Sequence, residues 1–190
     1  IGDNAGQITT AGNDFYFKTA PTTSTAQPIT AWILGDCGTA NSNQSAVRDA
    51  YYNYIGNKHT DMILLLGDNA YVSGLEEEYQ QAIFNMYPAK LKNTIMWSCP
   101  GNHEYYGTDG LAAAYYDIFT FPTRGEAGGK PSYTEKYYAY DYGNIHFVVD
   151  KKNDIINLSK LDFTGANLQE VCLANVIMQG CNFTNANIEG

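Results

Sequence analysis

The feature that most restricts the fold of this chain is a pattern that occurs three times: a short apolar run followed by a glycine-led polar turn. The runs are Ile29–Leu34, Met62–Leu66 and Thr94–Cys99. Continuous apolar runs of this length are typical of strands that are buried on both faces of a sheet. The stretches between them, Gln44–Ile55 and Glu76–Tyr87, carry apolar residues at steps of three and four, which predicts helices. Alternating strands and helices indicate an α/β fold with a mainly parallel sheet.

Further strands are expected on either side of this core pattern. Tyr137–Tyr142 and Asn144–Asp150 are predicted to be two strands joined by a tight turn at Gly143. Asp14–Thr19 alternates in the manner of a strand, and Ala20–Gln27 has the threonine, serine and proline content of a linker.

The three turns carry residues that can bind metal ions. They are Gly35-Asp36-Cys37-Gly38, Gly67-Asp68-Asn69-Ala70-Tyr71 and Gly101-Asn102-His103-Glu104. Each turn alone is common as a simple loop or cap, but all three follow apolar runs. Because residues beyond the carboxyl ends of parallel strands meet at one edge of a sheet, we expect these side chains to lie together. Carboxylate, phenol, amide and imidazole donors suit Fe, Mn or Zn.

The turns resemble the first three signatures of the metallophosphoesterases, Gly-Asp-x-Gly, Gly-Asp-x-x-Tyr and Gly-Asn-His-(Asp/Glu). Tyr71 makes the chain most similar to the purple acid phosphatase type. The resemblance covers about residues 1–150 and includes the strand pair that ends at Asp150. It implies that residues 1–20 are the tail of a preceding β-domain, and that residues 21–150 form part of a metallophosphoesterase domain.

The resemblance also implies a set of metal ligands. Asp36 would bind the first of two ions, Asp68 would bridge both, Tyr71 would bind the first and Asn102 the second. In the family the pair is Fe with Zn, Mn or Fe, and a tyrosine bound to ferric iron gives the purple colour. Two such cations hold a phosphoryl group between them and produce the attacking hydroxide.

Two other residues take roles from the resemblance. His103 would face a phosphate ester substrate and assist the leaving oxygen. Glu104 would not bind a metal ion itself but would orient the residues that do. The family has three further histidine ligands after the strand pair, whereas the only other histidines of this chain are His59 and His146. His59 is predicted in a loop before a strand and His146 within a strand, so we expect an incomplete dinuclear site that holds one ion weakly or none.

The pattern of apolar and polar residues changes after a junction at residues 151–155. Residues 156–190 fall into seven blocks of five, and a strict period predicts a repeat architecture. The blocks resemble the pentapeptide-repeat family, which implies a short right-handed, four-sided β-helix with four blocks in each coil. We expect this module to stand apart from the sheet. The third residue of each block would point inward: Leu158, Phe163, Leu168, Leu173, Met178, Phe183 and Ile188.

Composition excludes several classes of function. The formal net charge is −9, which argues against nucleic acid or an anionic membrane surface as a partner. No run of 18 apolar residues occurs, so no membrane span is expected. No signal peptide is visible, and a secreted or periplasmic location is implied only by the resemblance.

Three interpretations of function remain. The first is a metal-dependent phosphoric ester hydrolase of the purple acid phosphatase type with an incomplete metal site. The second is a non-catalytic binding or structural protein that uses the pentapeptide-repeat surface for a protein partner. The third is a fusion of two gene fragments.

Overall fold

Two β-sheets and several short helices make up the part of the chain that the computed structural model describes. One sheet has three strands and the other has four. The described residues are 12–13, 15–107, 110–150, 155–157, 164, 176–177 and 182–187.

The first sheet is parallel and has the order β1-β2-β3. Its strands are β1 (Ala31–Leu34), β2 (Met62–Leu65) and β3 (Ile95–Ser98). All four residues of the central strand β2 are buried, as expected for a strand covered on both faces. The three apolar runs therefore form the predicted parallel sheet.

Helices connect these strands. The predicted helix at Gln44–Ile55 is confirmed, and it begins two residues earlier because Asn41 caps the amides of Asn43 and Gln44. No helix among the described residues is long and apolar enough to span a membrane. The helical segments are α1 (Ser42–Ile55), α2 (Glu76–Tyr79), the π-helical η1 (Gln80–Phe84), α3 (Pro88–Leu91), the 3₁₀ turn η2 (His103–Tyr105) and α4 (Ala113–Ile118).

The second sheet has the order β4-β5-β6-β7. β4 (Tyr137–Tyr142) and β5 (Ile145–Asp150) form the predicted antiparallel pair. β6 (Ile155–Asn157) adds to β5 in antiparallel fashion. The last strand, β7 (Val176–Ile177), runs parallel to β6.

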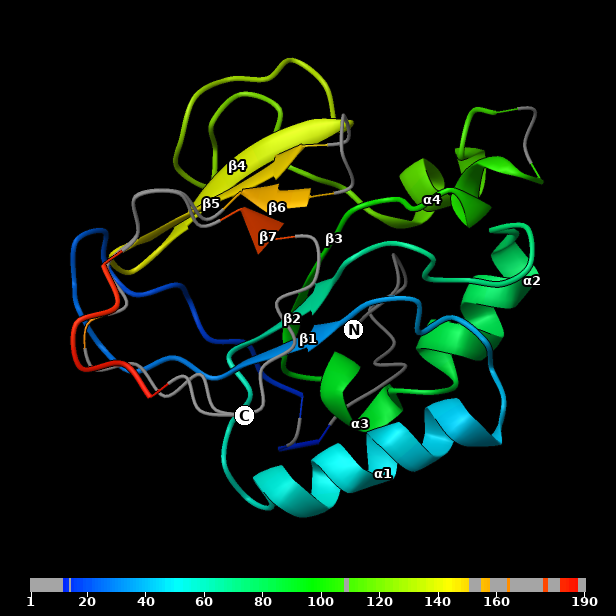
Figure 1. Ribbon diagram of the computed structural model, residues 1–190, viewed down its shortest axis with the longest axis horizontal. Helices are drawn as coiled ribbons and strands as arrows, with labels where there is room; N and C mark the ends of the chain where they lie inside the picture. The colour runs from blue at the N-terminus through cyan, green and yellow to red at the C-terminus, as the bar shows by residue number, and fades with distance from the viewer. Residues whose placement is uncertain are drawn as a thin grey trace.

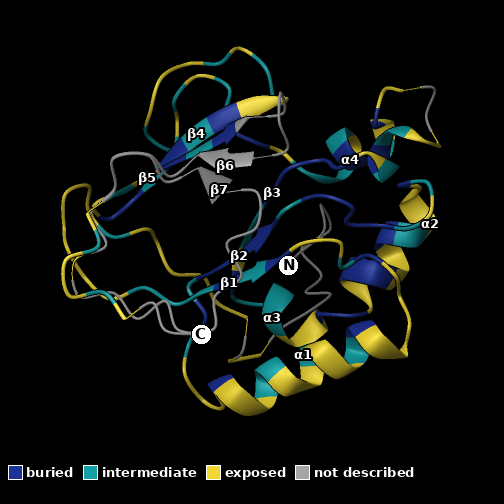
Figure 2. Ribbon diagram, viewed as in Figure 1, coloured by how far each residue is buried: buried dark blue, intermediate teal, exposed yellow. Residues whose placement is uncertain are grey.

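The first sheet lies between α1 and the second sheet (Figure 1). Trp32 of β1 stacks on Tyr51 of α1 with ring centroids 3.9 Å apart. Trp97 of β3 stacks on Tyr140 of β4 at 3.8 Å. Figure 2 shows the outward side of α1 exposed and the central strands buried. These layers cover the faces of the parallel sheet, so the polar residues of the turns lie at the ends of its strands.

Two expectations differ from the structure. Residues 15–19 form no strand, and Phe17 is 84% exposed, because no neighbouring strand among the described residues pairs with this segment. The repeat segment does not stand fully apart from the sheet, since Ile156 pairs with Val149 of β5. An open strand edge offers unpaired backbone groups, and β6 extends the sheet there. Residues 1–11, which include most of the predicted tail of a preceding domain, lie outside the described residues, as do most inward positions of the repeat.

Candidate metal centre

Three oxygen donors from the first two turns converge at the carboxyl ends of β1 and β2. The Tyr71 hydroxyl lies 3.1 Å from Asp36 Oδ1 and 3.2 Å from Asp68 Oδ2. Asp36 is exposed and Tyr71 is half-buried, whereas Asp68 is only 8% exposed. The structure therefore brings together three of the four predicted metal ligands, as the edge of a parallel sheet requires.

The turns can approach this closely because glycines lie where they touch. A Cβ at Gly38 would overlap backbone atoms of Asn69 and Ala70, and a Cβ at Gly101 would overlap Asp68. Backbone hydrogen bonds join the same turns: Gly38 N–H donates to Asp68 O at 3.1 Å, and Tyr71 N–H donates to Gly38 O at 2.9 Å. Direct backbone contact thus sets the spacing between the aspartates.

Both aspartates have a left-handed backbone. The φ angles of Asp36 and Asp68 are both 52°. Aspartate and asparagine adopt this region more readily than most other residues. The conformation turns the chain sharply after each strand and directs both carboxylates to the same side of the edge.

Each oxygen of the Asp68 carboxylate has a partner. Asp68 Oδ1 accepts the backbone N–H of His103 at 3.0 Å, and Asp68 Oδ2 accepts the Tyr71 hydroxyl. Burial raises the pKa of the Tyr71 phenol, and the charges of Asp68 and Asp36 raise it further. The phenol is thus a neutral donor that holds the two carboxylates together.

Glu104 organises the backbone beneath these candidate ligands. Its side chain is completely buried. Oε1 accepts the amides of Asn69 at 2.7 Å and Ala70 at 3.2 Å, and Oε2 accepts those of Asp68 at 3.0 Å and Gly101. Burial raises the pKa of Glu104 while the amides of Gly101, Asn69 and Ala70 lower it. One carboxylate therefore ties the second turn to the third.

His103 has a fixed orientation. Its Nδ1 lies 2.7 Å from the carbonyl oxygen of Val72. A carbonyl oxygen only accepts, so Nδ1 carries a proton and Nε2 is left to accept or release one. The ring lies between Tyr71, at a centroid distance of 4.5 Å, and Tyr106, at 4.7 Å. This packing, together with the Val72 contact, restricts the orientation of the imidazole next to Tyr71.

Asn102 is held by a residue to which no ligand role was assigned from the sequence. Its Nδ2 donates to the Tyr106 hydroxyl at 2.8 Å. Its Oδ1 has no hydrogen-bond partner among the described residues, and no hydrogen bond joins Asn102 to Asp36 or Asp68 there. An amide fixed through its nitrogen leaves its oxygen for a cation. The amide contact with a tyrosine four positions later depends on the 3₁₀ turn, which the sequence did not predict.

The two remaining histidines lie elsewhere. His59 precedes β2 and lies at the opposite end of the strands, with Nε2 4.0 Å from Asp61 Oδ1. His146 lies within β5 and its Nδ1 pairs with Asp141. Across the described part of the chain, no group of three or more histidine, cysteine, aspartate or glutamate side chains is placed to hold a metal ion.

The donors at the edge nevertheless fit a hard cation. Asp36, Asp68 and Tyr71 supply three oxygens within hydrogen-bond distance of one another, and hard divalent and trivalent ions prefer such ligands. A cation there would replace the phenolic proton that now joins the carboxylates. The described residues thus offer one oxygen-rich position and no imidazole ligand to complete it.

The mixed α/β fold, with its parallel sheet and this edge, is consistent with a metal-dependent phosphoesterase. The chain belongs to the calcineurin-like phosphoesterase family, whose sequence profile matches residues 29–175. The matched range includes all three turns and ends inside the segment where the sequence predicts pentapeptide repeats. A comparison with curated proteins finds no match.

Proposed function

We propose that this chain carries part of the metal centre of a phosphatase of the purple acid phosphatase type. The observation that carries the proposal is the contact of the Tyr71 hydroxyl with both Asp36 and Asp68. A tyrosine in this position distinguishes that type within the resemblance described above. Asp36, Asp68 and Tyr71 would hold the first ion, and Asn102 would serve the second.

The residues of the site would have separate roles in the hydrolysis of a phosphate ester. Bound ions of this class supply Lewis acidity to the phosphoryl oxygens and lower the pKa of the attacking water. His103 Nε2 can give a proton to the departing oxygen, because Nδ1 is occupied by Val72 O. Glu104 and Tyr106 act through the ligands: Glu104 holds the turn that carries Asp68, and Tyr106 holds the amide of Asn102.

The ligand set of these residues predicts weak metal binding by the 190-residue chain. Calorimetric titration with Mn²⁺ or Zn²⁺ is expected to show at most one ion per chain, with a Kd of about 0.1 mM or weaker. Asp68→Asn should weaken binding further, whereas Tyr106→Phe should leave the affinity for this single ion nearly unchanged, because Tyr106 contacts only Asn102, which would serve the second ion. Asp49→Asn makes the same chemical change on the exposed side of α1 and should have no effect. Hydrolysis of nitrophenyl phosphate between pH 4 and 8 should be slow or absent.

Two independent results would contradict this proposal. Tight binding of two ions per chain, or turnover lost on Asp68→Asn, would show that the centre is complete. Ferric loading tests the tyrosine ligand without reference to activity: a visible absorption band should appear and be lost in Tyr71→Phe. A band that persists in Tyr71→Phe would remove Tyr71 from the ligand set.

We also propose that residues from Ile156 onward form coils of the pentapeptide type, which would give the protein an additional surface for a protein partner. The register supports the coil, because Ile156 pairs with Val176 and both are first residues of five-residue blocks. These two residues are four blocks apart, the length of one coil. Asn182 Nδ2 also donates to Thr164 Oγ1 at 3.0 Å, which joins two further blocks.

The coil predicts a particular set of proton–proton contacts in the full chain. Nuclear Overhauser effects should link Asn157 to Ile177, and each later block to the block four positions beyond it, because stacked parallel strands bring these backbones together. Continuous contacts between residues three and four apart over residues 156–190 would instead indicate a helix and refute the coil.

A further inference from the structure

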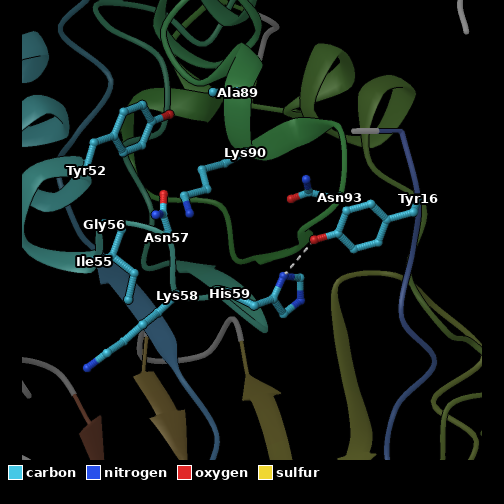
Figure 3. Close-up of a pocket in the computed structure, with 10 residues that line it drawn as sticks. All are labelled: Tyr16, Tyr52, Ile55, Gly56, Asn57, Lys58, His59, Ala89, Lys90 and Asn93. Atoms are coloured by element: carbon cyan, nitrogen blue, oxygen red, sulfur yellow. Dashed lines mark hydrogen bonds between the residues drawn. The ribbon is translucent and has the colours of Figure 1, made fainter. Parts of the chain in front are cut away.

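A basic pocket is formed by ten residues that include His59 and Asn93 (Figure 3). Because these two residues precede β2 and β3, the pocket lies at the amino ends of the strands, opposite the edge that carries Asp36 and Asp68. Its volume is about 320 Å³. Its walls come from the end of α1 and the loop after it, from α3 and the turn that follows, and from Tyr16. Strands of four residues rise about 13 Å, so a ligand here would not touch Asp36 or Asp68.

The charge of the pocket is opposite to that of the whole chain. Lys58, His59 and Lys90 line it, and no aspartate or glutamate is among the described residues that do so. The whole chain has 20 acidic and 11 basic residues. A local excess of positive charge in an acidic protein attracts anions to this place. Figure 3 shows Lys58 extending away from the others, so its charge lies at the rim.

Lys90 is the central cation. Among the described residues no carboxylate lies within ion-pair distance of its ammonium group. The nitrogen instead lies 5.8 Å from the ring centroids of both Tyr51 and Tyr52. Burial lowers the pKa of Lys90, which means that desolvation of this charge is not compensated by an anion. The Tyr52 hydroxyl, which points away from the Lys90 nitrogen in Figure 3, is buried and has no hydrogen-bond partner among the described residues.

His59 forms the opposite side of the pocket. The Tyr16 hydroxyl lies 3.4 Å from its Nδ1, and this contact is drawn in Figure 3. Burial lowers the pKa of His59, and the charge of Lys18 lowers it further. Asp61 is the nearest acid, at 4.0 Å from Nε2, and one of its oxygens already accepts the Thr30 amide at 2.8 Å.

The remaining lining groups favour an oxyanion with an organic part. Asn57 and Asn93 supply amide groups, while Tyr16 and Ile55 supply apolar surface. A tetrahedral phosphate accepts several hydrogen bonds at once, which ammonium, imidazole and amide donors can provide. The volume is at the lower end of the range for small-molecule sites.

We propose that this pocket is a second, non-catalytic site that binds the phosphate group of a small phosphorylated molecule. The ligand is inorganic phosphate or a small phosphate monoester, and the chemistry recognised is the same in both. Its binding does not depend on the metal centre, so the proposal stands apart from the proposed function.

The test uses the full 190-residue chain after removal of metal ions with a chelator. Inorganic phosphate, phenyl phosphate and phenol are titrated by calorimetry, while the imidazole signals of His59 are followed by NMR. Both phosphates should bind at one site per chain and shift the His59 signals. Lys90→Gln should weaken binding about tenfold, because a charge-assisted hydrogen bond is lost. Lys136→Gln, the same change at an exposed lysine before β4, should leave the affinity unchanged.

Comparison of the three ligands distinguishes a phosphate monoester from inorganic phosphate, and it can refute the proposed site. Tighter binding of phenyl phosphate than of inorganic phosphate assigns the pocket to a monoester, and equal binding assigns it to the phosphate group alone. Three results would refute the proposal: no saturable phosphate binding below about 10 mM, equal losses in Lys90→Gln and Lys136→Gln, or phenol binding as tightly as phenyl phosphate. A readout that does not depend on any variant is the wild-type chain itself: unchanged His59 signals on adding phosphate would also refute the proposal.

Discussion

Replacement of Glu104 by alanine is expected to lower the free energy of unfolding by about 4 kcal/mol or more. Four backbone amides, those of Asp68, Asn69, Ala70 and Gly101, donate to this one buried carboxylate. A buried donor left without a partner costs about 1–3 kcal/mol, and rearrangement or entry of water recovers part of the sum. Urea denaturation followed by circular dichroism measures the change.

Two further variants make the Glu104 experiment specific. Glu104→Gln keeps the shape but places an NH₂ group opposite two amide donors whichever way the amide is turned, so it should be nearly as destabilising as alanine. Glu77→Ala removes an exposed carboxylate on α2 and should change stability by less than about 0.5 kcal/mol. If Glu104→Gln proved as stable as the wild type, the carboxylate would not be the connection between the turns.

Gly38→Ala should destabilise the protein by about 3 kcal/mol and also weaken metal binding. The new methyl group would overlap backbone atoms of Asn69 and Ala70, which are held from the other side by Glu104 and cannot move aside freely. Displacement of that turn would separate Asp36 from Asp68. Thermal unfolding and calorimetric titration with Mn²⁺ measure the two effects on one preparation.

The first turn contains its own control. At Gly35, three residues earlier, an added Cβ would lie 3.5 Å from the Leu66 Cβ, which is an ordinary contact. Gly35→Ala should therefore change stability by less than about 1 kcal/mol in either direction. Equal destabilisation by Gly35→Ala and Gly38→Ala would mean that general loop flexibility, and not close backbone contact, explains the glycines.

The sequence predicts the parallel sheet well because its signal is local. Each apolar run needs only its own residues to indicate a doubly covered strand, and β1, β2 and β3 all lie inside the predicted ranges. The stretch from Glu76 to Tyr87 is less regular than predicted. α2 passes into a π-helical turn, and the chain leaves helical geometry at Tyr87, where the following Pro88 disfavours it.

The proximity of Asp36, Asp68 and Tyr71 is predictable from the sequence, but the contacts that hold them are not. The sequence places Asp36, Asp68 and Tyr71 at one edge, because the ends of parallel strands must meet there. It does not predict that Glu104 accepts four amides, since that depends on how the third turn folds beneath the second. Nor does it predict the contact of Asn102 with Tyr106, which depends on side-chain rotamers that no periodicity encodes.

The addition of β6 to the second sheet has a similar explanation. The five-residue period predicts which side chains share an interior, but it carries no information about what lies beside the first block. The edge of β5 is a long-range feature, and pairing with it depends on the position of the chain after Asp150.

The left-handed backbone of Asp36 and Asp68 affects how any mutational study of this centre should be interpreted. Alanine at either position would carry a conformational penalty of about 1–2 kcal/mol in addition to the lost carboxylate. A scan with alanine would therefore mix ligand loss with a distorted turn and overstate the contribution of metal binding. Asparagine accepts the same backbone and keeps one of the two acceptor oxygens, so it removes the charge without adding the backbone penalty. The same backbone conformation limits which residues can replace these aspartates in evolution. Residues other than aspartate, asparagine and glycine are sterically disfavoured there, whatever their effect on catalysis.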